Sequence, residues 1–228
     1  PLIAEHPTWF RRDADGQVVS PSVIDPADTE KVTVWGDLAE VDNAGSPDRE
    51  ALWRHWEGLV LRLLEVGCTG FRCDAAYKVP APLWRRLVDT AEARRPEVVF
   101  VAETLGCRLE EIEALGEAGF GYLYNSSKWW DFVEPWCLEQ HEQFRVLAPS
   151  IAFPESHDTA RLAAETGASE AVQRQRYAFA AARADLDRAL FGADVHFISQ
   201  RTFRQERRAD RHQASAGDGN GLRLHGGR

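Results

Sequence analysis

Three acidic residues stand at, or just after, the ends of short apolar segments of the sequence. Asp74 ends the segment GFRCD, Glu103 ends VVFVAE, and Asp158 follows SIAFP within a few residues. A strand-plus-helix repeat takes about 30 residues, so these acids lie one repeat and then about two repeats apart. In a parallel sheet, that spacing places all three at the carboxyl ends of the strands, where active sites of such folds form.

Each acid taken singly is typical of a helix N-cap or a solvated loop residue. Three acids in phase at the same end of their strands favour a catalytic site instead. Arg72 supports this interpretation, because residues two apart on a strand point to the same face and an inward-facing charge must be paired. A guanidinium beside Asp74 would keep that carboxylate ionised, as a nucleophile requires. A purely structural buried ion pair is the alternative for Arg72 and Asp74.

The elements that must position these acids are short apolar strands alternating with helices that carry one apolar stripe. The expected strands cover 69–74, 98–103, 122–125 and 150–154, with a fifth candidate at 195–198, and the expected helices cover 46–67, 82–95, 108–117, 129–140 and 169–190. The stripe of the first helix comprises Leu52, Trp53, Trp56, Leu59, Val60, Leu63 and Leu64. This rhythm predicts an α/β fold with a parallel sheet buried on both faces. A closed (β/α)₈ barrel needs eight strands and an open doubly wound sheet also fits, so the pattern leaves that choice undecided.

The two ends of the chain differ from this regular middle part. Residues 1–45 form a polar excursion that we expect to be irregular, apart from one short strand at 32–35. Residues 200–228 are rich in Arg, Gly and Ser and poor in apolar residues, which is typical of disorder. A basic nucleic-acid arm is the less favoured alternative for this tail. We therefore expect a catalytic unit over 1–199, with its strand–helix units in 46–199, and a disordered basic tail over 200–228.

The composition excludes several other functions. A formal net charge of -9 argues against nucleic acid or an anionic membrane as the partner, and no apolar run is long enough to span a bilayer. The four cysteines form no C-x-x-C pair and have no nearby histidine cluster, which argues against zinc. We expect reduced thiols in a cytoplasmic protein.

Three ordered motifs resemble those of the alpha-amylase family, glycoside hydrolase family 13. They are GFRCDAAYKVP at 70–80, VFVAE at 99–103 and SHD at 156–158. The opening PLIAEHPTWF and Pro80 resemble the maltosyltransferase-like branch of that family. The resemblance covers roughly residues 1–180 and implies a partial TIM (β/α)₈ barrel with strands four to seven. The family's first motif is absent and the tail departs from the family pattern, so we expect truncation at both ends, with a frame change as a hypothesis for the tail.

The resemblance also implies roles for individual residues. Asp74 would be the nucleophile, Glu103 the general acid/base, and Asp158 a third catalytic carboxylate that clamps sugar hydroxyls. Arg72 would support Asp74, and His157 would bind the sugar in the innermost subsite. A further position, Lys78, stands where many relatives have a histidine that touches the leaving-group sugar. A solvated lysine at a helix start is an equally good interpretation of Lys78.

These roles imply a retaining alpha-glycosidase or transglycosidase that acts on alpha-glucans or maltooligosaccharides through a covalent glycosyl-Asp intermediate. The mechanism requires no cofactor. Some members of the family bind structural calcium, but the sequence shows no cluster of ligands for it, so we expect no metal, and the oligomeric state stays open. The alternative is a non-catalytic remnant or a carbohydrate-binding homologue. A serine hydrolase is disfavoured because the sequence has no G-x-S-x-G elbow. Among Trp129, Trp130 and Trp136, we expect two to belong to the core, which leaves one for sugar binding.

Overall fold

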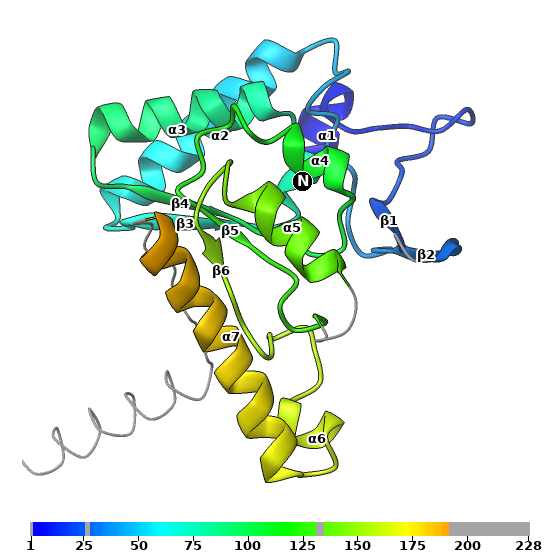
Figure 1. Ribbon diagram of the computed structural model, residues 1–228. Helices are drawn as coiled ribbons and strands as arrows, with labels where there is room; N and C mark the ends of the chain where they lie inside the picture. The colour runs from blue at the N-terminus through cyan, green and yellow to red at the C-terminus, as the bar shows by residue number, and fades with distance from the viewer. Residues whose placement is uncertain (1, 26–27, 131–134, 192–228) are drawn as a thin grey trace, which may run out of the picture.

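The computed structural model describes residues 2–25, 28–130 and 135–191. Four parallel strands form its main sheet in the order β3 (Gly70–Cys73), β4 (Val99–Ala102), β5 (Tyr122–Tyr124) and β6 (Ser150–Ile151). The longer helices are α2 (Arg49–Glu65), α3 (Ala81–Arg94), α5 (Trp136–Phe144) and α7 (Glu170–Phe191), and the short ones are η2 (Ala76–Lys78), α4 (Leu109–Glu113) and α6 (Leu162–Glu165). Figure 1 shows α2 and α3 side by side along the sheet. Within the described residues, no helix is long and apolar enough to cross a membrane.

The register of the sheet separates its two faces. Cys73 pairs with Ala102, and Ala102 pairs with Leu123, so one row of side chains crosses three strands. This row is buried in the main core together with residues of α2 and α3. Alternate strand positions point to the opposite face, which therefore carries Arg72 and Tyr124. The predicted parallel α/β sheet is confirmed, and its second face bears the polar residues of interest.

The helix α2 begins and ends close to the predicted residues, but its start works differently. Ser46 does not cap the helix; its hydroxyl donates to the Thr8 carbonyl at 2.9 Å and accepts the Asp48 N–H at 3.2 Å. Ser46 therefore turns the chain ahead of the helix and attaches it to the N-terminal segment. The helix stops as expected before Gly67, whose φ of +104° suits a residue without a Cβ.

The predicted apolar stripe of α2 is too wide at Leu59. Leu52, Val60 and Leu64 are buried, whereas Leu59 is 41% exposed. The helix packs through one narrow face, and Leu59 lies beyond its edge. On the other side, Arg86 of α3 bonds to both Glu50 and Glu57 of α2, so polar contacts complete the helix pair.

Two helix boundaries differ from the predictions for local reasons. The helix α4 stops at Glu113, because the following N–H groups of Leu115 and Gly116 bond three residues back instead of four. The helix α5 begins only at Trp136, directly after Pro135, since a proline suits a helix start and has no N–H for its interior. The fifth strand candidate at 195–198 and the tail at 200–228 lie outside the described residues.

The N-terminal segment is more ordered than predicted, although the strand expected at 32–35 overlaps β2. It contains the short helices α1 (Leu2–Glu5) and η1 (Pro7–Trp9) and an antiparallel pair, β1 (Ser22–Asp25) with β2 (Asp28–Val34). Every residue of β2 is exposed. With neither face of β2 buried, its first residues, 28–31, show no apolar alternation, so the sequence indicated only the end of the strand.

Replacing two leucines of α2 one at a time should distinguish its buried face from its exposed face. Leu64→Ala leaves a cavity in the core, because Leu64 is only 4% exposed, and should lower the free energy of unfolding by about 2–5 kcal/mol. The control Leu59→Ala should change it by less than about 1 kcal/mol. Urea denaturation followed by circular dichroism measures both. Equal losses would show that Leu59 is packed.

Candidate active site

Asp74 and Glu103 are the first residues after two adjacent strands. The parallel ladder continues past the strand ends, because the Glu103 N–H donates to the Cys73 carbonyl at 2.9 Å. The Ala76 N–H then donates to the Glu103 carbonyl at 3.0 Å. These two bonds hold the backbones of both acids side by side at the carboxyl edge of the sheet.

The side chain of Glu103 turns into the protein and is 8% exposed. Its two oxygens accept the backbone N–H groups of Ala75, at 2.9 Å, and of Leu105, at 2.7 Å. Ala75 has φ 41° and ψ 48°, a left-handed conformation that residues with a Cβ seldom adopt. This backbone conformation directs the Ala75 N–H toward the Glu103 carboxylate, so the segment after Asp74 has the conformation that this hydrogen bond requires.

The surroundings of Glu103 favour its protonated form. Burial raises its pKa above the ordinary value of 4.5, and the negative charge of Asp74 acts in the same direction. The N–H groups of Leu105 and Ala75 and the charge of Arg72 lower the pKa but do not cancel the rise. Glu103 therefore has the properties of a carboxyl that keeps its proton above the usual glutamate range.

Asp74 has the opposite environment. Its side chain is 77% exposed and accepts a hydrogen bond from Arg72, with 2.5 Å between Nη1 and Oδ1. Arg72 also lies over the ring of Tyr124, 5.9 Å from its centroid. The predicted pairing is present, but the prediction that the pair is buried was wrong, because the sheet leaves this face open. Asp74 is thus an accessible carboxylate beside a fixed cation.

Asp158 and His157 lie on the loop after β6. Their side chains pair with each other at 3.0 Å, between Nε2 and Oδ2, and are 70% and 58% exposed. The Asp158 N–H donates to the hydroxyl of Ser156. All three predicted acids thus follow the carboxyl ends of parallel strands. The structure joins Asp74 to Glu103, whereas these contacts of Asp158 lie within its own loop.

Buried polar residues that the sequence analysis did not single out hold this loop. The carboxylate of Glu155 accepts a hydrogen bond from the Leu162 N–H at 2.9 Å and so links the two ends of the loop that contains His157 and Asp158. The hydroxyl of Ser127 accepts the Phe153 N–H at 2.7 Å and donates to the Phe153 carbonyl at 3.1 Å. Glu155 directly precedes the SHD motif, and its place at the end of an apolar run was the available signal.

A groove with a volume of about 600 Å³ lies beside η2 and the residues that follow it. Residues 40–44, residues 77–81 and the start of α4 line it. Tyr77 marks its proximity to Glu103, because burial and then the charge of Glu103 raise the tyrosine pKa. The ammonium group of Lys78 lies 5.4 Å from the centroid of the Tyr77 ring. The groove has the size of a small-molecule site and brings Lys78 to its wall.

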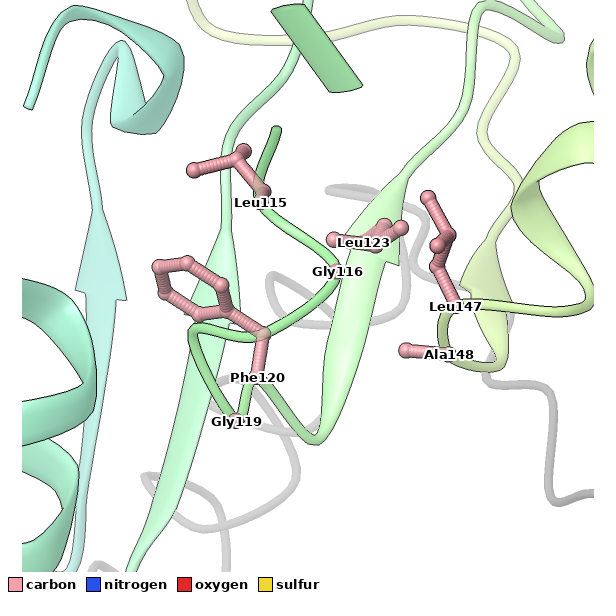
Figure 2. A pocket seen from close by; sticks show the side chains of 7 residues that line it. All are labelled: Leu115, Gly116, Gly119, Phe120, Leu123, Leu147 and Ala148. Carbon is pink, nitrogen blue, oxygen red and sulfur yellow. The ribbon is translucent and has the colours of Figure 1, made fainter. Parts of the chain in front are cut away.

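The cavity in Figure 2 is of another kind. It has a volume of about 30 Å³ and is surrounded by apolar side chains such as Leu115, Phe120 and Leu147. That is about the volume of one water molecule. The cavity is a packing void between residues 115–120, β5 and residues 147–148, and has no room for a substrate.

The three tryptophans of the β5–α5 region differ in burial. Trp130 is fully buried, Trp136 is partly buried and packs against it, and Trp129 is 48% exposed. The cysteines are free, and burial raises the pKa of Cys73 and Cys107 to about 12, which makes both thiols unreactive. Among the described residues, no group of three or more His, Cys, Asp or Glu could hold a metal ion.

Several curated proteins are similar to this chain in sequence. An alpha-1,4-glucan:maltose-1-phosphate maltosyltransferase of Burkholderia pseudomallei is 28% identical over 176 residues, which are 76% of this chain and 15% of that protein. Its counterpart in Myxococcus xanthus is 30% identical over 132 residues, or 58% of this chain and 18% of that protein. The chain thus spans less than a fifth of the length of these relatives. No family model matches it.

Solved structures show the same fold. An alpha-amylase from Lactobacillus plantarum superposes with a TM-score of 0.58 at 23% identity, over 87% of this chain and 47% of that one. An Anoxybacillus alpha-amylase gives 0.54 at 15% identity, over 86% and 43%. These matches cover part of an amylase chain, in agreement with a partial barrel. The chain is therefore similar in sequence to maltosyltransferases and shares its fold with alpha-amylases, in agreement with the resemblance to the alpha-amylase family and its maltosyltransferase-like branch.

Proposed function

We propose that this chain carries the catalytic carboxylates of a retaining alpha-glycosidase or transglycosidase acting on alpha-glucans or maltooligosaccharides. The supporting observation is the contrast between two neighbouring acids. Asp74 is open to solvent and paired with Arg72, while burial raises the pKa of Glu103. Two carboxyls in opposite environments divide the roles of nucleophile and acid.

The chemistry follows from these roles. Glu103 gives its proton to the glycosidic oxygen while an oxygen of Asp74 attacks the anomeric carbon, which breaks the glycosidic bond and forms a glycosyl ester. Glu103, now ionised, takes a proton from the acceptor, and the acceptor oxygen displaces Asp74. Water as acceptor gives hydrolysis, and a sugar hydroxyl or phosphate gives transfer.

The positions of the two acids support retention of anomeric configuration. Strands that pair lie about 4.8 Å apart, and Asp74 and Glu103 end paired strands. Retaining enzymes hold the two carboxyls about 5–5.5 Å apart, whereas inverting enzymes need about 6.5–9.5 Å to admit a water. The shorter separation is the one that adjacent strands favour.

The remaining residues would bind and orient the sugar. His157 and Asp158 are exposed on a loop that Glu155 holds, and both can bond to sugar hydroxyls. The groove beside Tyr77 and Lys78 would receive the leaving group and the acceptor. Maltosyl transfer, the activity in the names of the relatives, is the transfer reaction that we propose to test first.

A non-catalytic carbohydrate-binding homologue is the second candidate. The contacts of Asp158 favour it, because those with the described residues lie within its own loop, whereas the catalytic role would place Asp158 beside Asp74 and Glu103. Maltooligosaccharide binding without turnover by the chain would support this candidate over the first.

Removal of the nucleophile should abolish turnover. Asp74→Asn keeps the size of the side chain but cannot form the glycosyl ester, so turnover of an aryl alpha-maltoside should fall by about four orders of magnitude or more. NMR of the first product formed by the unaltered chain should show the alpha anomer. An initial beta product would mean inversion and would remove Asp74 as nucleophile.

Removal of the acid should depend on the leaving group. Glu103→Ala should slow cleavage of a maltooligosaccharide by about 10²–10⁴-fold, but should spare the first step with a nitrophenyl leaving group, which needs no proton. Single-turnover kinetics separates that step from the second. Glu103→Gln controls for the loss of side-chain volume. Equal losses with both classes of substrate would contradict the acid role.

The raised pKa of Glu103 should be visible in titrations. Carbon-13 NMR of labelled glutamate should show Glu103 ionising above the ordinary value of 4.5. Because the folded pKa lies above the unfolded one, the contribution of Glu103 to stability is highest at low pH. It decreases as pH rises from the unfolded pKa through the folded pKa. Ionisation at or below the ordinary value would show that the carboxylate is solvated.

A further inference from the structure

Trp129 is exposed at the carboxyl edge of the sheet, although its neighbour Trp130 is fully buried. It follows β5, whereas Tyr77 and Lys78 of the groove follow β3, and β4 lies between these two strands. The residue is 48% exposed, so about half of its surface remains open to solvent. An indole held in this way presents an apolar surface to solvent beside the candidate active site.

A strip of aromatic contacts connects Trp129 to the catalytic pair. Arg72, which binds Asp74, lies 5.9 Å from the ring centroid of Tyr124. The ring of Tyr124 lies 5.7 Å from that of Phe153, and Phe153 lies 6.3 Å from Trp129. The strip therefore runs along the open face from the nucleophile to the exposed indole.

The position of Trp129 is fixed on both sides. The preceding Lys128 has a side chain that is only 5% exposed, pairs with Glu165 of α6 at 2.6 Å and lies 6.0 Å from the indole centroid. Two hydrogen bonds of Ser127 hold the backbone of Phe153. A surface ordered before the ligand arrives loses little conformational entropy on binding.

We infer that Trp129 is a stacking platform for a pyranose ring of an alpha-glucan, and that it extends the binding site along the β5–β6 side. The C–H groups on one face of a glucose ring form an apolar surface that packs on the negative face of an indole, while the hydroxyls stay at its rim. The inference rests on the proposed function, which supplies the ligand class. It assigns to Trp129 a preference for longer glucans, because a short one can occupy the site near Asp74 without reaching the indole.

Binding of maltoheptaose and of maltose to the 228-residue chain, measured by isothermal titration calorimetry, tests this inference. Trp129→Leu keeps an apolar contact to Phe153 but has no flat face, and should lower the affinity for maltoheptaose about tenfold, the value of one aromatic contact. Trp129→Phe should retain most of that affinity. Neither variant should change the affinity for maltose more than about twofold.

The matched control is Leu138→Ala on α5, which also removes an exposed apolar side chain and should bind maltoheptaose like the unaltered chain. Circular dichroism of each variant verifies the fold. Unchanged binding by Trp129→Leu, an equal loss with Trp129→Phe, or no binding of maltoheptaose by the unaltered chain would each overturn the inference.

The variant Asp74→Asn distinguishes this inference from the proposed function. Normal glucan binding by Trp129→Leu, together with loss of turnover in Asp74→Asn, would overturn the platform and leave the catalytic proposal intact. The reverse pair of results would support the platform and contradict the catalytic role of Asp74.

Discussion

The candidate site depends on the backbone ladder between β3 and β4. Its last two bonds, from Glu103 N–H to the Cys73 carbonyl and from Ala76 N–H to the Glu103 carbonyl, extend it past the regular strands. Because these bonds fix the register of the two strands, Asp74, which follows β3, lies beside Glu103, which follows β4. The left-handed backbone at Ala75 then supplies an N–H to the Glu103 carboxylate. One hydrogen-bonded unit thus positions both acids.

That arrangement also produces the difference between the two carboxyls. Glu103 lies under the turn that follows Asp74, so burial raises its pKa. Asp74 stays on the open face, where Arg72 compensates its charge. A shift of one residue in the strand pairing would turn one of the acids to the helix-covered face, where the core of Cys73, Ala102 and Leu123 lies.

The β5–β6 side is organised by buried polar groups. Ser127 ties the loop after β5 to Phe153 at the end of β6, and Glu155 closes the loop that carries Asp158. Buried groups of this kind are satisfied by their partners and rigidify what they connect. The same connections carry the aromatic strip to Trp129, so the loop of Asp158 and the proposed sugar platform share one support.

The sequence alone was enough to predict the parallel α/β fold, the alternation of strands and helices along the chain and the position of the three acids at strand ends, because apolar periodicity and strand–helix spacing are local properties. It also predicted the pairing of Arg72 with Asp74 from their alternation along one strand. The exposure of that pair and the outward position of Leu59 depended on which faces other segments cover. Which of Trp129, Trp130 and Trp136 are buried also depended on this coverage by other segments. Burial is a property of the assembled chain, so the packing of the segments against one another was needed to show which indole fills the core and which is exposed at the site.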